Sequence, residues 1–445
     1  MTNALLGCSA PVTITPVTTE SPTPEPEASA TPTLDPHHTP TPVEHFCDLP
    51  GSVRFTAAGR VVVPSTPGPS TDLTFLQLPV GFCAGYFTTV PNPRELKFAP
   101  SGELFVASPS RITAGGGFGR GAILVFPDDN QDGFGDTQIT YLGGIAASHG
   151  LLFAGEYLYY QHDTAIMRVP YKYGDRRASG ASEQVGKIEV YSSMIHWPKP
   201  LEMADDGTIY VGNGGDQGDL CEPANAFHGG ILALDAAMPG GRPIAKGLRN
   251  PISIRCVPGH DRCYAIELSR DWSGAVGGRE KIIPVREGDD WGYPCCATKD
   301  LPYPDSPAHA DCSAVPPETN SFQIGDTPFD LDFEPGRWPE PWRHRAFVPL
   351  HGSFPLWIGA RLVAIEMDPE SGELRMGSNL PGEAAGGLRD FATGWDDGTR
   401  THGRPASVVF SDDGRLFLGN DRNGDIIWIA PLDLRIPRAP EEPSQ

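Results

Sequence analysis

One pattern of apolar and polar positions occurs three times in clear form along the chain. An apolar residue is followed by small or polar residues and a glycine, and then by a short apolar run that ends in small residues. The clear copies read FAPSGELFVA (98–107), MADDGTIYVG (203–212) and FSDDGRLFLG (410–419). The glycine permits the positive φ of a tight hairpin, and the run after it is typical of a half-buried strand.

Weaker copies lie at 158–160, 263–265 and 346–348. The aromatic positions of all six copies are Phe105, Tyr159, Tyr210, Tyr264, Phe347 and Phe417, at intervals of 54, 51, 54, 83 and 70 residues. A unit of roughly 50 residues with several short strands has the size of one propeller blade. The pattern therefore predicts an all-β, six-bladed β-propeller, with insertions in the two long intervals.

Composition agrees with strands and turns. The 445 residues include 52 Gly and 47 Pro, and 39% are hydrophobic, which is enough for a core. A TIM barrel needs helical periodicity between its strands, and little is found. A disulfide-bonded pair of β-sandwiches remains as the structural alternative.

The charge of the chain narrows its partners. Lys and Arg number 34 against 56 Asp and Glu, which gives a net charge of −22. A nucleic-acid partner is disfavoured because phosphate neutralisation needs clustered cations, and so is adhesion to anionic lipid through a basic face. No apolar run approaches the ~20 residues that span a bilayer.

The first 45 residues differ from the rest of the chain. The tetrad Leu5-Leu6-Gly7-Cys8 looks like a bacterial lipobox, so residues 1–8 are interpreted as the remnant of a lipoprotein signal with a lipid anchor on Cys8. Residues 11–45 hold nine Pro, nine Thr and no Lys or Arg, and the segment 9–45 is predicted to be a disordered stalk. We expect the propeller over 46–435 and a disordered tail over 436–445.

Cysteine usage indicates export. Cys8 apart, eight cysteines remain, an even number compatible with four disulfides in an oxidising compartment. Cys256 and Cys263 bracket a short turn and form the first expected pair. The alternative is a set of reduced, buried cysteines in a cytosolic protein. We predict a periplasmic or cell-surface protein, anchored through lipid.

Candidate chemistry lies beside the repeated strands, where a propeller places functional groups at the mouth of its central channel. His196, before the third repeat, could act as a general base near neutral pH. Arg249 and Asn250, before the fourth repeat, could clamp an anionic, carbonyl-rich ligand. Two further clusters precede the second and sixth repeats; they are Ser148-His149 and His402-Gly403-Arg404. Each of these residues taken alone could equally be structural.

Two segments raise the question of a metal ion. Carbonyl groups at the turn around Ser269 and Arg270, with carboxylates nearby, suit a hard cation such as Ca²⁺. The run DDNQDG at 128–133 resembles the start of a calcium loop, but the glutamate expected later in such a loop is missing. We interpret this second segment as a hairpin tip.

Taken in order, these motifs resemble those of the pyrroloquinoline quinone (PQQ)-dependent sugar dehydrogenases, which include soluble aldose and glucose dehydrogenases, sorbosone dehydrogenase and pyranose dehydrogenases. The resemblance covers roughly residues 80–432. The motifs that carry it are His-Gly-Leu at 149–151, His196, Gly-Leu-Arg-Asn-Pro at 247–251, Arg-Asp at 270–271, Trp-Gly-Tyr-Pro at 291–294, His-Gly-Ser at 351–353 and Gly-Arg-Pro at 403–405.

The resemblance implies a role for each matching residue. His196 would take the proton from the C1 hydroxyl of a sugar while hydride passes to the quinone. Arg249 and Asn250 would hold PQQ oxygens, and Arg404 would contact PQQ from the other side. Ser148, His149 and His402 are counted with the cofactor-binding residues, and the backbone carbonyls of Ser269 and Arg270 would hold Ca²⁺.

Three positions depart from the family pattern. His402 stands where the glucose dehydrogenases have a second arginine. After His351-Gly-Ser the family often continues Trp-Asn-Arg, but this chain reads Phe354-Pro355-Leu356. Ile195 replaces the aspartate that precedes the catalytic histidine in glucose enzymes. These departures put sugar specificity and PQQ binding in question, but not the fold.

The sequence thus predicts a PQQ- and Ca²⁺-dependent oxidoreductase that acts on a small sugar or related polyol and passes electrons to an unidentified acceptor. One alternative is a non-catalytic cell-surface propeller that binds carbohydrate or protein. The other is a metal-dependent lactonase-type propeller, which is disfavoured because the inward candidates are His and Arg rather than carboxylates.

Overall fold

The computed structural model of the protein describes residues 43–65, 72–110, 119–188, 196–215, 221, 229–270, 278–308, 310–354 and 356–437. The expected lipobox, the anchor on Cys8 and the stalk up to residue 42 lie outside the described residues, as does the tail from 438. Those expectations stay predictions.

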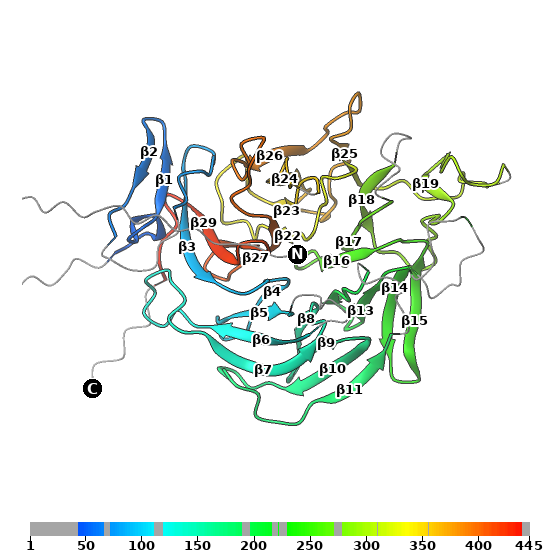
Figure 1. Cartoon of the computed structure of the whole chain (residues 1–445), viewed down its shortest axis with the longest axis horizontal. Helices are drawn as coiled ribbons and strands as arrows, with labels where there is room; N and C mark the ends of the chain where they lie inside the picture. The colour runs from blue at the N-terminus through cyan, green and yellow to red at the C-terminus, as the bar shows by residue number, and fades with distance from the viewer. Residues whose placement is uncertain are drawn as a thin grey trace, which may run out of the picture. The chain divides into compact units, whose positions relative to one another are not determined.

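The described chain consists of sheets that follow one another around a common centre, and all but one of their strand pairs are antiparallel (Figure 1). The first three sheets are β4 (Leu96–Phe98), β5 (Leu104–Ser108), β6 (Arg120–Phe126) and β7 (Ile139–Ala146); β8 (Leu151–Ala154), β9 (Tyr157–His162), β10 (Ala165–Pro170) and β11 (Glu183–Lys187); and β12 (Leu201–Met203), β13 (Ile209–Asn213), β14 (Gly230–Asp235) and β15 (Met238–Lys246).

Of the next three sheets, the first and the last have additional strands. Their strands are β16 (Pro251–Cys256), β17 (Cys263–Glu267), β18 (Arg279–Pro284), β21 (Asn320–Gln323) and β25 (Gly377–Ser378); β22 (Asp332–Phe333), β23 (Arg345–Leu350), β24 (Arg361–Glu366) and β26 (Leu388–Ala392); and β27 (Pro405–Phe410), β28 (Leu416–Asn420), β29 (Asp425–Pro431), β3 (Phe82–Thr89), β1 (Val53–Thr56) and β2 (Gly59–Val62). A short hairpin of β19 (Cys296–Thr298) and β20 (Leu301–Pro302) and a 3₁₀ turn, η1 (Phe46–Asp48), complete the described elements.

These sheets are the six blades of a β-propeller, as the repeat predicted. The first strands of neighbouring blades contact one another around the centre, including β4 with β8, β8 with β12, β12 with β16, and β27 with β4. The ring is closed because β3, from the N-terminal side, pairs antiparallel with β29 at the C-terminal side (Figure 1). The two-sandwich alternative is therefore wrong.

The six aromatic positions read from the repeat all fall on the second strand of a blade, namely β5, β9, β13, β17, β23 and β28. The two long intervals also have a structural reason. The interval after Tyr264 contains the β19–β20 hairpin, and the interval after Phe347 contains β25 together with its flanking turns. What the repeat did not indicate is the two-stranded extension β1–β2 on the last blade.

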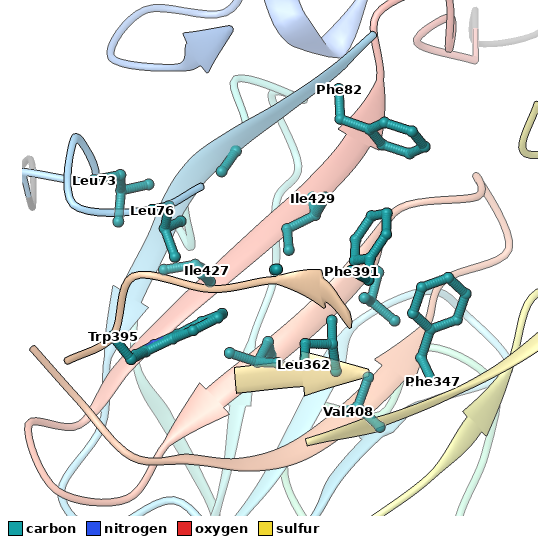
Figure 2. Packing of buried hydrophobic residues seen from close by; sticks show 14 of the residues in the cluster. Leu73, Leu76, Phe82, Phe347, Leu362, Phe391, Trp395, Val408, Ile427 and Ile429 are labelled. Carbon is teal, nitrogen blue, oxygen red and sulfur yellow. The ribbon is translucent and has the colours of Figure 1, made fainter. Parts of the chain in front are cut away.

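Apolar side chains between adjacent blades hold the ring together. Between the fifth and sixth blades, Leu362, Trp395 and Ile429 are fully buried and point toward one another (Figure 2). Truncating a buried leucine of this kind to alanine costs about 2–5 kcal/mol. The centre of the ring thus lies among blades whose positions are fixed by tight packing, so groups carried on their loops are held in place.

All eight cysteines outside the N-terminal segment form disulfides: Cys47–Cys83, Cys221–Cys295, Cys256–Cys263 and Cys296–Cys312. The expected Cys256–Cys263 pair is confirmed. Four disulfides are typical of proteins that fold in an oxidising compartment, which agrees with export. None of the described segments forms an apolar helix of membrane-spanning length.

Candidate active site

A cavity of about 620 Å³ lies at one end of the ring, where each first strand begins and each second strand ends. Its wall is made by loops from five blades, and the residues are Arg94, Trp197, Pro198, Arg249, Asn250, Ile252, Leu268, Glu280, Ile324, Gly325, Thr327, Phe329, His351, Ser353, Phe354, Trp357 and Arg404. Strands that run antiparallel bring these loops to the same face, although they are up to 310 residues apart in the chain. A cavity of this size is in the range of small-molecule and cofactor sites.

The wall contains three arginines, which are Arg94, Arg249 and Arg404. Among its described residues Glu280 is the only carboxylate. Behind the wall, the buried Asp421 holds two of these arginines. Its Oδ2 lies 2.6 Å from Arg94 Nη1, and its Oδ1 accepts a hydrogen bond from Arg404 Nε. One carboxylate shared by two guanidinium groups leaves net positive charge, which favours an anionic ligand.

Flat aromatic rings complete the wall. The Arg404 guanidinium lies 4.2 Å from the centre of the Trp357 ring, and Arg94 lies 5.4 Å from that of Phe329. Phe329 in turn stacks on the His351 imidazole at 4.0 Å. Burial, together with Arg404 and Arg94, holds the pKa of His351 well below its usual value, so this ring is neutral.

His196 lies directly behind the wall, in the segment before β12. It is buried, and its Nδ1 lies 2.9 Å from the carbonyl oxygen of Gly215. Because a carbonyl only accepts hydrogen bonds, Nδ1 carries the proton and Nε2 carries the lone pair. Its chain neighbours Trp197 and Pro198 line the cavity.

Gly214 explains how His196 and Asn250 come together. A Cβ at Gly214 would lie 2.6 Å from the His196 Cβ and 3.2 Å from the Asn250 Oδ1, so only glycine fits between them. The next residue, Gly215, donates its backbone N–H to the Arg249 carbonyl at 2.6 Å. The third and fourth blades thus place His196 next to the Arg249–Asn250 pair.

The turn around Ser269 and Arg270 is also in this region. The Ser269 carbonyl oxygen accepts a hydrogen bond of 2.8 Å from Arg249 Nη1. The Arg270 side chain points elsewhere, since it forms a two-pronged ion pair with Asp305 and stacks on Tyr303. Carbonyl oxygens suit Ca²⁺, but one of these two already holds a guanidinium. Within the described ranges, no cluster of three or more His, Cys, Asp or Glu side chains could hold a metal ion.

The other expected cofactor residues do not line the cavity. Ser148 and His149 are buried beneath it, where His149 packs edge-on against Trp197 and its Nε2 lies 3.2 Å from the Ile252 carbonyl. Burial is the main reason that the pKa of His149 falls to about 3. His402 is exposed, and its ring stacks on Phe75 at 4.6 Å.

Below the cavity, the axial channel is filled by an ion-pair network. The buried Arg255 on β16 donates hydrogen bonds to Glu95 at 2.8 Å and to Asp330 at 3.0 Å. Asp330 also accepts from Ser253 Oγ at 2.7 Å and from the Val408 backbone N–H at 3.1 Å. These five residues come from four blades, so the network ties the first strands together.

The sequence interpretation missed several residues in the cavity wall or directly behind it. Arg94, Phe329, Trp357 and Asp421 were not singled out. Arg94 and Phe329 come just before the first strands of their blades, at the same place as Arg249 in the fourth blade. That position within the repeat was the signal that could have found them.

The run at 128–133 lies away from this cavity, at the β6–β7 turn, and is a hairpin tip as expected. Its carboxylates have protein partners: Asp132 Oδ1 accepts the Phe134 N–H at 2.9 Å, and Asp129 forms an ion pair with Arg176. Burial raises the pKa of Asp128 to about 6, while Arg415 opposes that shift.

No protein-family model matches the sequence, and no curated protein matches it either. Several solved structures do match the structure of this chain. The PQQ domain of a pyranose dehydrogenase from Coprinopsis cinerea matches with a TM-score of 0.64 at 17% identity, over 82% of this chain and 98% of that one. The chain has the fold of a PQQ-dependent sugar dehydrogenase.

Two other structures agree. An enzyme of carbohydrate-active family AA12 from Trichoderma reesei, solved with calcium, has a TM-score of 0.64 at 17% identity, over 82% of this chain and 99% of that one. The PQQ-bound aldose sugar dehydrogenase from Streptomyces coelicolor has a TM-score of 0.53 at 16% identity, over 79% of this chain and 99% of that one. These likenesses show the fold.

Proposed function

We propose that the protein oxidises a hydroxyl group of a sugar, with PQQ as cofactor. The observation that carries the proposal is the convergence of Arg249, Asn250 and Arg404 on one cavity, with His196 directly behind its wall. The shared fold with PQQ-dependent sugar dehydrogenases supports it at the level of architecture.

The cavity fits PQQ, which is a planar tricarboxylate. Three guanidinium groups match its negative charge, and the rings of Trp357 and Phe329 match its flat shape. Arg249 and Asn250 would hold it on one side and Arg404 on the other. When bound, PQQ supplies a quinone that accepts hydride from the sugar carbon.

His196 is the base in this proposal. With its proton fixed on Nδ1 by the Gly215 carbonyl, Nε2 is the atom that accepts the proton of the sugar hydroxyl. His351 is neutral and adds no positive charge to the cavity. The three arginines would therefore carry the electrostatic stabilisation.

For Ca²⁺ we propose a weaker, dependent site. The carbonyls of Ser269 and Arg270 would be its protein ligands, and the Arg249 hydrogen bond to Ser269 must be shared or released for it to bind. Two carbonyls are few for a cation that takes six to eight oxygens. We therefore expect Ca²⁺ to bind only together with the cofactor.

Other parts of the function rest on the sequence. The lipobox at Cys8 supports a lipid-anchored protein outside the cytoplasm, and the disulfides agree with that location. Ser148, His149 and His402 would then act on the cofactor indirectly, because none of them lines the cavity. A redox protein or dye outside the membrane would accept the electrons.

The test is to add PQQ and Ca²⁺ to purified apoprotein and to follow cofactor absorbance and dye reduction with a panel of aldoses. His196→Ala should lower kcat by about 10²–10⁴ and leave PQQ affinity within about twofold of the wild type. His260→Ala, on the β16–β17 turn at the opposite end of the blades, is the matched control and should leave kcat unchanged.

Two results would contradict the proposal. Failure of the apoprotein to bind PQQ at micromolar concentration would favour a carbohydrate-binding propeller. Lactone hydrolysis without PQQ would assign the protein to a hydrolytic class.

A further inference from the structure

The β23–β24 loop, residues 351–360, carries exposed aromatic and apolar side chains at the mouth of the cavity. Phe354 is 79% exposed and yet is one of the cavity-lining residues. Arg249 and Asn250, at the base, are 7% and 3% exposed. This gradient places Phe354 at the rim and the cofactor-type residues at the base.

Hydrogen bonds connect the loop to the neighbouring segment 325–327. The backbone N–H groups of His351 and Gly352 donate to Thr327 and Asp326, at 3.0 and 3.1 Å, and Ser353 Oγ donates to the Gly325 carbonyl at 3.0 Å. A loop anchored in this way can present a side chain to a ligand at little entropic cost.

Trp357 is strained in this loop. Its φ is +60°, which a bulky side chain adopts only at an energetic cost, and its N–H donates to the Ser353 carbonyl at 2.6 Å. The indole lies 4.2 Å from the Arg404 guanidinium and 5.5 Å from the Phe354 ring. Trp357 thus contacts both a cation of the wall and the exposed ring at the rim.

The Phe354 side chain contributes little to the stability of the fold. Burying a phenylalanine stabilises a fold, but this ring remains in water, with Trp357 as its aromatic neighbour among the described residues. Aromatic faces carry negative charge and attract the slightly positive C–H groups on the flat side of a pyranose. The hydroxyl groups of the same sugar can reach the polar atoms of Ser353 and Arg404 on the same wall.

We infer that Phe354 and Trp357 form an outer subsite for a second pyranose ring, so that the protein binds disaccharides or longer glycans in preference to monosaccharides. The inference rests on the proposed function for the identity of the inner ring, which is the one oxidised at the base. The outer ring stacks on Phe354, and no bond to it changes.

The subsite can be tested without oxidation. Methyl glycosides lack a free C1 hydroxyl, so their binding to apoprotein reports the subsite alone. The methyl α- and β-glycosides of disaccharides built from glucose, galactose, mannose or xylose are titrated beside the matching methyl monosaccharides. Tryptophan fluorescence and calorimetry measure the binding. At least one disaccharide should bind about tenfold more tightly than its monosaccharide.

Phe354→Ala should remove that preference and leave monosaccharide affinity unchanged. Leu356→Ala is the matched control, because Leu356 is also exposed, at 55%, but does not line the cavity. It should keep the tenfold preference. Circular dichroism and thermal unfolding establish that both variants are folded.

The outcomes separate this inference from the proposed function. A Phe354-dependent preference in a protein that takes up no PQQ would support the subsite and overturn the proposed PQQ-dependent oxidation. A protein that oxidises sugars with PQQ, but in which no disaccharide of the panel binds more tightly than its monosaccharide, would overturn the subsite. Equal losses in Phe354→Ala and Leu356→Ala would overturn it as well.

Discussion

Arginines in two regions along the propeller axis have different surroundings. In the channel, Arg255 donates to the Glu95 and Asp330 carboxylates, and all three residues are buried. In the cavity, Arg94 and Arg404 share the single carboxylate of Asp421. Arg255 is therefore surrounded by more carboxylates than cations, whereas the cavity arginines outnumber the carboxylates beside them.

The difference indicates which region binds a ligand. Removing one partner from an ion network enclosed by protein is strongly destabilising, because it leaves a buried charge without compensation. A wall with more cations than anions at the end of an open cavity is stabilised when an anion binds. The charge surroundings thus distinguish an arginine enclosed by carboxylates from arginines that favour an anionic ligand.

The largest expected effect is on stability, from Arg255→Met. This change keeps the side-chain volume but leaves the Glu95 and Asp330 carboxylates buried without their cation, so the free energy of unfolding should fall by about 3–5 kcal/mol. Denaturant titration under oxidising conditions measures it. An unchanged midpoint would show that the network is not needed for the fold.

The matched change in the cavity is Arg404→Met, which should weaken PQQ binding by about 10–100-fold, because a charge-assisted hydrogen bond contributes about 1.5–3 kcal/mol. Calorimetric titration of apoprotein measures the affinity, and added salt should weaken the variant less than the wild type. A stability loss as large as that of Arg255→Met would remove the distinction between the two regions.

The effect that is smallest at neutral pH concerns His149, which lies between the two regions. Burial lowers the pKa of His149 to about 3 from its ordinary value of 6.5. Above pH 6.5 the ring is neutral in both the folded and unfolded states. As the pH falls below 6.5, the unfolded state takes up a proton that the folded state refuses, so stability falls by up to about 1.4 kcal/mol per pH unit.

His149→Gln should reduce this acid dependence, because an amide has no proton to gain and can still donate to the Ile252 carbonyl. Unfolding free energies of the two proteins, measured between pH 4 and 7, check it. Parallel pH profiles would show that His149 does not contribute.

Much of the architecture was predictable because it is local and repeated. Each copy of the hairpin pattern, such as the one at Phe105, needs only a glycine turn and a run of apolar residues, and both can be read from adjacent positions. The site was predictable only in part. Arg249 and Arg404 were found, and Arg94 could have been found from its position before a first strand, whereas Asp421 carries no local pattern that distinguishes it from ordinary surface charges.

The amino-acid sequence by itself determined the all-β class, the number of blades and the set of cysteines available for pairing. Only the tertiary structure decided which charges meet, because Asp421 lies 327 residues from Arg94 in the chain and 2.6 Å from it in space. Hairpins follow from neighbouring residues, but a binding cavity depends on the angle at which six independent sheets are packed.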